Sequence, residues 1–122
     1  MTAGAAGPFT AAVRESVVGP VVEAAGELDY ESAPQLRGVL RGALAVRPAP
    51  AMLVVDLAGV TFCDSAGLNV LLQIRLDAER QGTVVHLARP THIVTRVLEM
   101  TRADLLFPLD PDVPAVRETG GG

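Results

Sequence analysis

Hydrophobic and polar positions alternate at the start of the chain, which is the pattern of a half-buried β-strand. The alternation is mild from Phe9 to Val18, Gly19-Pro20 then breaks it, and a second extended run follows from Val21 to Ala25. Glycine and proline at the break favour a turn. The pattern therefore predicts two short strands joined by a turn.

A helical spacing replaces the alternation after the polar connection Gly26–Tyr30. Ser32 and Gln35 have the spacing of a capping box, and Pro34 stands in the first turn, where proline is favoured. The apolar residues that follow recur every three or four positions: Leu36, Val39, Leu40, Ala43 and Leu44. This stripe predicts an amphipathic helix that begins near Ser32 and buries one face.

A short apolar run and a second helix occupy the middle of the chain. Met52–Val55 is too short for a helix and is typical of a strand covered on both faces, so we expect it to be the central strand. Asp64 and Ser65 are both suitable caps for the helix that follows. That helix is expected to extend to about Gln81, where Gly82 supplies a C-terminal stop.

The last third of the chain repeats the order of strand and helix. Thr83–Ala88 is β-branched and extended, Pro90-Thr91 opens a third helix, and Leu105–Phe107 is expected to form a last short strand. Helices that alternate with hydrophobic strands pack on a sheet whose middle strands are parallel. The sequence therefore predicts an α/β fold, a mixed central β-sheet flanked by about three to four helices.

Length and composition bring these elements into one domain. The chain has 122 residues, of which 49% are hydrophobic and only 3% aromatic, so one aliphatic core is expected. We expect the domain to span residues 9–109, with flexible tails at 1–8 and 110–122, where Gly, Ala and Pro are frequent. No secretory signal or membrane-spanning run is found, so we expect a cytoplasmic protein without membrane contact.

Charge and residue usage exclude several kinds of chemistry. The net charge is −4, and the ten basic residues are all arginines scattered singly, so direct nucleic-acid binding is not expected. Without lysine the chain cannot form a P-loop. Cys63, the single cysteine, cannot form an internal disulfide and is interpreted as a small buried hydrophobe. The spacing of cysteine and histidine gives no metal site, and we expect no cofactor.

Ser65 is the strongest candidate for a functional residue. It stands where a loop meets a helix N-terminus, whose free N–H groups and dipole favour a phosphate of about −1.5 to −2 charges. Asp64 adds a neighbouring negative charge, so phosphorylation would concentrate a field that rejects a surface fitted to neutral serine. Ordinary N-capping is the alternative role of Ser65.

A catalytic role for Ser65 has less support. The Gly-x-Ser-x-Gly elbow of hydrolases is absent, because Cys63 stands two residues before the serine. His86 or His92 could in principle activate Ser65, but lone histidines are more often structural. We therefore expect that the chain is not an enzyme.

Several segments around Ser65 combine into a recognisable signature. The segments are Gly26–Asp29, Ala33–Leu36, Val54–Leu57, Val60–Phe62, Asp64–Leu68 and Thr101–Pro108. Together they resemble the STAS family, named for sulfate transporters and anti-sigma factor antagonists, over about Phe9 to Leu109. Ala66 departs from the several members with a second hydroxyl residue there, which leaves Ser65 as the sole local acceptor.

The resemblance implies a phosphorylation cycle of the anti-sigma factor antagonist type. In such proteins the serine of the Asp-Ser motif is phosphorylated by an anti-sigma factor, a serine kinase of the histidine-kinase-like ATPase fold. The unmodified antagonist binds this kinase and frees a sigma factor, which regulates transcription. The phosphorylated form is released until a metal-dependent serine phosphatase restores it. The alternative is a STAS scaffold, or a subunit of a stress-signalling or lipid-transport complex, without such a cycle.

The partner-binding surface is expected around the same serine, and two of its residues have alternative roles. We assign to it Asp29, Asp64, Ser65, Ala66, Gly67 and Leu68. Asp29 should lie near Ser65 because functional loops gather at the carboxyl edge of an open sheet, although it could instead cap the helix near Ser32. Gly67 could admit a partner's backbone or simply allow close helix packing.

Overall fold

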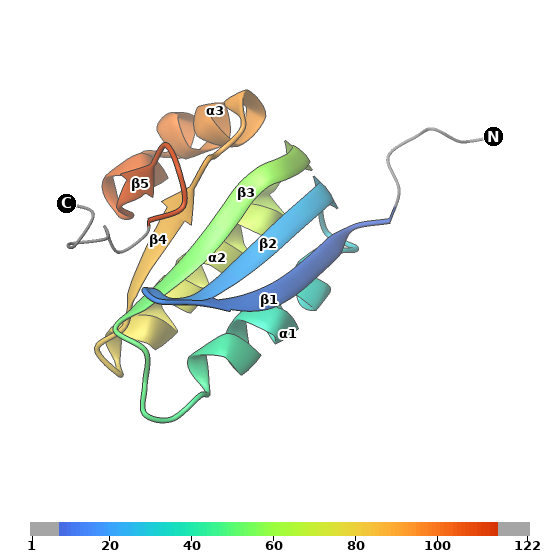
Figure 1. The fold of residues 1–122 in the computed structure, drawn as a ribbon. Helices are drawn as coiled ribbons and strands as arrows, with labels where there is room; N and C mark the ends of the chain where they lie inside the picture. Colours follow the sequence, from blue (N-terminus) through green and yellow to red (C-terminus); the bar gives the residue numbers. More distant parts are fainter. Residues whose placement is uncertain (1–7, 115–122) are drawn as a thin grey trace, which may run out of the picture.

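The fold is a single mixed sheet with its helices on one face (Figure 1). The computed structural model describes residues 8–114. The strand order is β1-β2-β3-β4-β5, in which β1 is antiparallel to β2 and all other neighbours are parallel. The elements are β1 (Thr10–Ser16), β2 (Gly19–Leu28), α1 (Ala33–Leu44), β3 (Met52–Cys63), α2 (Ser65–Glu79), β4 (Val84–Ala88), α3 (His92–Thr101), the 3₁₀ turn η1 (Ala103–Leu105) and β5 (Leu109–Asp110). The expected mixed sheet is confirmed, and the about three to four helices that were expected are, within the described residues, three α-helices and a 3₁₀ turn.

The central strand β3 was placed correctly but is much longer than Met52–Val55. It continues to Cys63, because irregularities in its register with β2 accommodate the small residues that interrupt its apolar pattern. At one of them Gly59 lies opposite Ala25, and a Cβ on Gly59 would approach the Ala25 Cβ to 2.7 Å. The strand β2 likewise runs to Leu28, through part of the segment predicted to be a connection.

The main core lies between the sheet and the three helices. Alternate residues of β3, namely Leu53, Val55 and Leu57, face this core. The helices α1 and α2 lie behind the sheet in Figure 1 and contribute four large, fully buried aliphatic side chains: Leu36, Leu40, Leu71 and Ile74. The opposite face carries only a small buried cluster, formed by Val21, Val54 and Ala88. One face of the sheet is therefore free of helices.

The capping box predicted at the start of α1 does not form. Ser32 is the N-cap residue, but its backbone is already helical (φ −92°, ψ −17°), and its side chain makes no cap hydrogen bond. Its hydroxyl instead donates to the Glu27 carbonyl (2.7 Å) and accepts from the Asp29 N–H (2.9 Å). The Gln35 amide donates to the Phe9 carbonyl (3.3 Å), so it ties α1 to the start of β1.

The last strand also differs from its prediction at Leu105–Phe107. Arg102 adopts a left-handed conformation (φ 65°), so the chain reverses after α3 into the 3₁₀ turn η1, and the strand pairing with β4 begins only at Leu109. Val113 packs against the helix-free face, so the folded part extends past residue 109, where we expected the domain to end. Residues 1–7 and 115–122 of the predicted tails lie outside the described residues.

The three α-helices of the described residues have 12, 15 and 10 residues. Within residues 8–114, none is long and apolar enough to cross a bilayer.

Candidate functional site

Ser65 lies at the edge of the sheet where the parallel strands end. It is the first residue of α2, two positions after the end of β3. The end of β2 lies beside it, because Leu28 is the register partner of Cys63 and accepts a hydrogen bond from the Asp64 N–H (3.2 Å). Asp29 follows Leu28 directly, so the structure brings Asp29 and Ser65 to the same edge, as predicted.

Asp64, not Ser65, caps the helix α2. The Asp64 backbone is extended (φ −106°, ψ −172°), and its Oδ1 accepts from the N–H groups of Ala66 (2.9 Å) and Gly67 (3.2 Å). The expectation that free N–H groups here would hold a phosphate on Ser65 is wrong for these two amides, because the Asp64 carboxylate already binds them. A phosphate on Ser65 would therefore face solvent beside the carboxylate.

The three serines of the chain differ sharply in their surroundings. The Ser32 hydroxyl is buried and hydrogen-bonded, and the Ser16 hydroxyl donates to the Gly19 carbonyl (2.8 Å). Ser65 is exposed, and its side chain makes no hydrogen bond within residues 8–114. Its hydroxyl is thus the one most open to another protein.

Asp29 has a structural role at this edge. Its Oδ1 accepts hydrogen bonds from the N–H groups of Glu31 (2.9 Å) and Ser32 (3.0 Å). This geometry supports the alternative reading, in which the carboxylate organises the start of α1. A recognition role for Asp29 stays a prediction.

The other predicted contact residues differ in exposure. Ala66 is half-buried, whereas Gly67 and Leu68 are buried. A Cβ on Gly67 would lie 2.5 Å from the Leu28 Cγ and 3.0 Å from the Leu28 carbonyl oxygen. The close-packing reading of Gly67 is therefore supported, and both buried residues shape the site from beneath.

Cys63 sits under this edge as an inert thiol. Burial, reinforced by the Asp64 charge, raises the pKa of the thiol to about 11. The side chain belongs to the main core, as expected for a small buried hydrophobe. Nucleophilic chemistry of this thiol is accordingly suppressed at neutral pH.

Neither geometry nor pairing supports His86 as a base for Ser65. The His86 Nδ1 lies 2.7 Å from Asp110 Oδ2. Its register partner Val54 precedes Cys63 by nine residues, which is about 30 Å of strand at about 3.3 Å per residue. His92 begins α3 and is exposed. His86 therefore cannot activate the serine in this fold.

Three exposed apolar residues at the same edge were missed from the sequence. Tyr30 follows β2, Phe62 lies near the end of β3, and Ile93 lies near the start of α3. The sequence pattern alone does not distinguish an exposed apolar side chain at this edge from one in the core. The available signal was their placement: Tyr30 stands in a polar connection, and the chain has only four aromatic residues.

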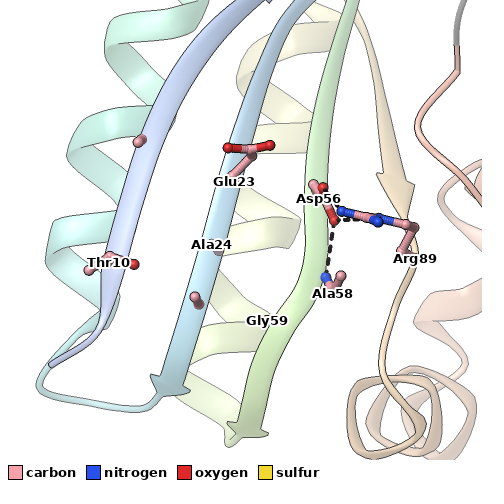
Figure 2. Close-up of a pocket in the computed structure, with 9 residues that line it drawn as sticks. Thr10, Glu23, Ala24, Asp56, Ala58, Gly59 and Arg89 are labelled. Atoms are coloured by element: carbon pink, nitrogen blue, oxygen red, sulfur yellow. Dashed lines mark hydrogen bonds and ion pairs between the residues drawn. The ribbon is translucent and has the colours of Figure 1, made fainter. Parts of the chain in front are cut away.

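A depression lies on the helix-free face of the sheet (Figure 2). It has a volume of about 280 Å³, and in it Arg89 reaches across to the buried carboxylate of Asp56 (2.6 and 3.2 Å). The Asp56 hydrogen bonds and charge raise the pKa of the Arg89 guanidinium above its ordinary value. Glu23, which also lines the depression, pairs with Arg14 (3.0 Å). These charges satisfy one another, and the Asp56–Arg89 pair clamps β3 to the end of β4.

Metal ions in proteins are held mainly by the side chains of His, Cys, Asp and Glu residues. Among those the structure describes, no group of three or more His, Cys, Asp or Glu residues could hold a metal ion.

The structure is a small α/β domain whose helices cover one face of the sheet. Its candidate binding surface lies at the carboxyl edge of the sheet, where an exposed serine follows a capping aspartate. The chain belongs to the STAS family, because the family model described as "Mlab, STAS domain" matches residues 11–108.

Solved structures that are similar to this chain include anti-sigma factor antagonists and a sulfate transporter family protein. An anti-sigma factor antagonist from Mycobacterium paratuberculosis is 29% identical, with a TM-score of 0.74 over 87% of this chain and 88% of that one. The phosphorylated form of the Bacillus cell fate determinant SpoIIAA is 19% identical, with a TM-score of 0.63 over 84% and 90%. A sulfate transporter family protein from Wolinella succinogenes is 16% identical, with a TM-score of 0.69 over 82% of each. The last two likenesses concern the fold alone.

Proposed function

We propose that this chain is an anti-sigma factor antagonist whose binding to an anti-sigma factor kinase is controlled by phosphorylation of Ser65. The observation that carries the proposal is the division of roles at the start of α2. Asp64 provides the cap, and the Ser65 hydroxyl is left exposed. The likeness to the Mycobacterium paratuberculosis antagonist over most of both chains supports the same role.

The proposed switch acts through charge. A phosphate would stand next to the Asp64 carboxylate, while Asp64 occupies the Ala66 and Gly67 amides that would otherwise bind it. Its charge of about −1.5 to −2 is then presented to the partner. A kinase surface fitted to a neutral hydroxyl would lose affinity, because desolvating an unpaired charge is costly.

The rest of the cycle follows the family resemblance. The kinase has the histidine-kinase-like ATPase fold, a metal-dependent serine phosphatase removes the phosphate, and the cycle operates in the cytoplasm. In this scheme the domain is substrate and ligand rather than enzyme. Release of the sigma factor then links the state of Ser65 to transcription.

The test is an intact-mass measurement after incubation with candidate anti-sigma factor kinases and ATP. The wild type should gain one phosphoryl group and Ser65→Ala none. Ser16→Ala and Thr61→Ala, which remove other hydroxyls, should be labelled like the wild type. Equal labelling of Ser65→Ala would overturn the proposal, and absence of labelling by every kinase would favour a scaffold or transport-complex subunit without a serine cycle.

A further inference from the structure

Three exposed apolar residues lie at the same sheet edge as Ser65: one follows β2, one is near the end of β3, and one is near the start of α3. Tyr30 is 79% exposed, and Phe62 and Ile93 are each 44% exposed. Phe62 is the register partner of Glu27, three residues before Tyr30. The start of α3 is held to the same edge, because the Thr91 hydroxyl donates to the Val60 carbonyl (2.8 Å). We call these three residues the apolar arc.

The arc contributes little to the fold that carries it. Its members are at least 44% exposed, whereas the core is built from aliphatic residues that are almost completely buried. Single exposed apolar residues are common in soluble proteins. Here, however, two of the four aromatic residues of the chain are exposed at the sheet edge that carries the candidate phosphorylation site. Aromatic side chains are also the ones that most often anchor protein interfaces.

The charge around the arc defines the partner. Glu27, Asp29, Glu31 and Asp64 lie on the β2 and β3 side, and no basic residue occurs from 15 to 36 or from 48 to 74. On the other side Arg96 lies one turn after Ile93 and is exposed. A second copy facing this edge would bring acidic groups together, which is unfavourable.

We propose that the apolar arc of Tyr30, Phe62 and Ile93 anchors a protein partner whose docking surface is apolar at its centre and basic where it meets Glu27 and Glu31. The inference rests on the proposed function, because it takes Ser65 as the centre of the interface. The apolar arc and the acidic residues have separate roles. The apolar side chains supply binding affinity, whereas the acidic residues fix the orientation of the partner and speed its association.

The first experiment locates the partner on the surface. A photo-crosslinking amino acid is placed at Tyr30, Phe62 or Ile93 in the full chain, produced in its native cells. Val17 (79% exposed) and Val84 (50% exposed), which stand at the amino ends of β2 and β4, are the matched controls. One protein should crosslink from the three arc positions and not from the controls. Crosslinks only from the controls, only between copies of this chain, or from no position would overturn the inference.

The second experiment measures affinity for the crosslinked protein after purification. Phe62→Ala and Tyr30→Ala should each weaken binding about tenfold or more, whereas Val17→Ala and Val84→Ala should change it less than about threefold. The four side chains are exposed, so all variants should fold, which circular dichroism checks. Equal effects at both edges would contradict the proposal.

The acidic side of the interface is tested by salt dependence. Neutralising Glu27 and Glu31 (Glu27→Gln, Glu31→Gln) should slow association and flatten its dependence on ionic strength, since exposed charges are screened within about 10 Å at 0.1 M salt. Glu15→Gln on β1 is the control and should leave both unchanged. An unchanged dependence of the association rate on ionic strength in the double variant would contradict the proposal that the partner's surface is basic there.

The two proposals fail in different ways. If the crosslinked protein binds through the arc but never phosphorylates Ser65, the arc stands and the phosphorylation switch is lost. If Ser65 is phosphorylated normally by its kinase in Phe62→Ala and Tyr30→Ala, with unchanged KM, the switch stands and the arc is lost.

Discussion

Gly67 tests how tightly the start of α2 is seated on the sheet. Replacing it by alanine would place a methyl group 2.5 Å from the Leu28 Cγ and 3.0 Å from the Leu28 carbonyl oxygen. Leu28 is completely buried at the end of β2, and its carbonyl accepts the Asp64 N–H. Neither atom can move without disturbing the edge that carries Ser65.

The expected magnitude is a difference between two effects. Overpacking a core position costs about 1–3 kcal/mol, and the severity of this contact favours the upper part of that range. Alanine in a helix interior recovers about 1 kcal/mol relative to glycine. Gly67→Ala should therefore lower the free energy of unfolding by about 1–2 kcal/mol, or the melting temperature by about 4–8 °C.

Gly38 and Gly42 in α1 provide the matched control. A Cβ at either position would meet no atom within 4 Å, so Gly38→Ala and Gly42→Ala should each stabilise the protein by about 1 kcal/mol. Urea unfolding of all three variants is the assay. A Gly67→Ala protein that gains stability like the controls would refute the packing argument. A double-mutant cycle with Leu28→Ala should show less than additive loss, because the two side chains compete for one space.

Further predictions concern Asp29, Cys63 and Ser65. Asp29→Ala should cost about 1 kcal/mol in urea unfolding because it removes the carboxylate that accepts the Glu31 and Ser32 N–H groups, and Asp29→Asn should retain part of it. Cys63 should react with thiol reagents at pH 8 at least a hundredfold more slowly than in urea, since a pKa of about 11 leaves roughly a thousandth of the thiol ionised. Because this pKa is raised above the unfolded value of 9.0, the associated stability should be fully present below pH 9 and lost as the pH rises towards 11, as pH-dependent unfolding would reveal. Ser65→Asp should weaken binding of the kinase at least tenfold in calorimetry, and unchanged affinity in both this variant and the phosphorylated protein would contradict the switch.

The helices and the central strand were predictable because their signals are local. The stripe from Leu36 to Leu44 and the run Met52–Val55 each identify a buried surface from spacing alone. The full length of β3 was not predictable in this way. Directly after that run the strand continues through Asp56, whose buried carboxylate is paired with Arg89, a residue distant in sequence. A local sequence pattern cannot reveal an ion-pair partner that lies far away in the sequence.

The start of α1 illustrates the same limit at shorter range. Ser32 and Gln35 match a capping box in sequence, yet the match says nothing about the backbone conformation that a cap requires. Ser32 is already helical, so Asp29 binds the N–H groups of Glu31 and Ser32 instead. The family motif that contains Asp29 therefore has a structural explanation that is independent of any partner.

The Asp64-Ser65 pair shows why the candidate site could be located but not resolved from sequence. Both residues are good caps, and only the extended backbone of Asp64 decides which carboxylate or hydroxyl reaches the first-turn amides. Once Asp64 takes that position, Ser65 becomes the first helical residue and has no structural duty that phosphorylation would abolish. A serine that capped its own helix would lose its cap hydrogen bonds on entering a kinase active site. The neighbouring aspartate removes this conflict, so the same two residues can maintain the fold and expose a modifiable hydroxyl.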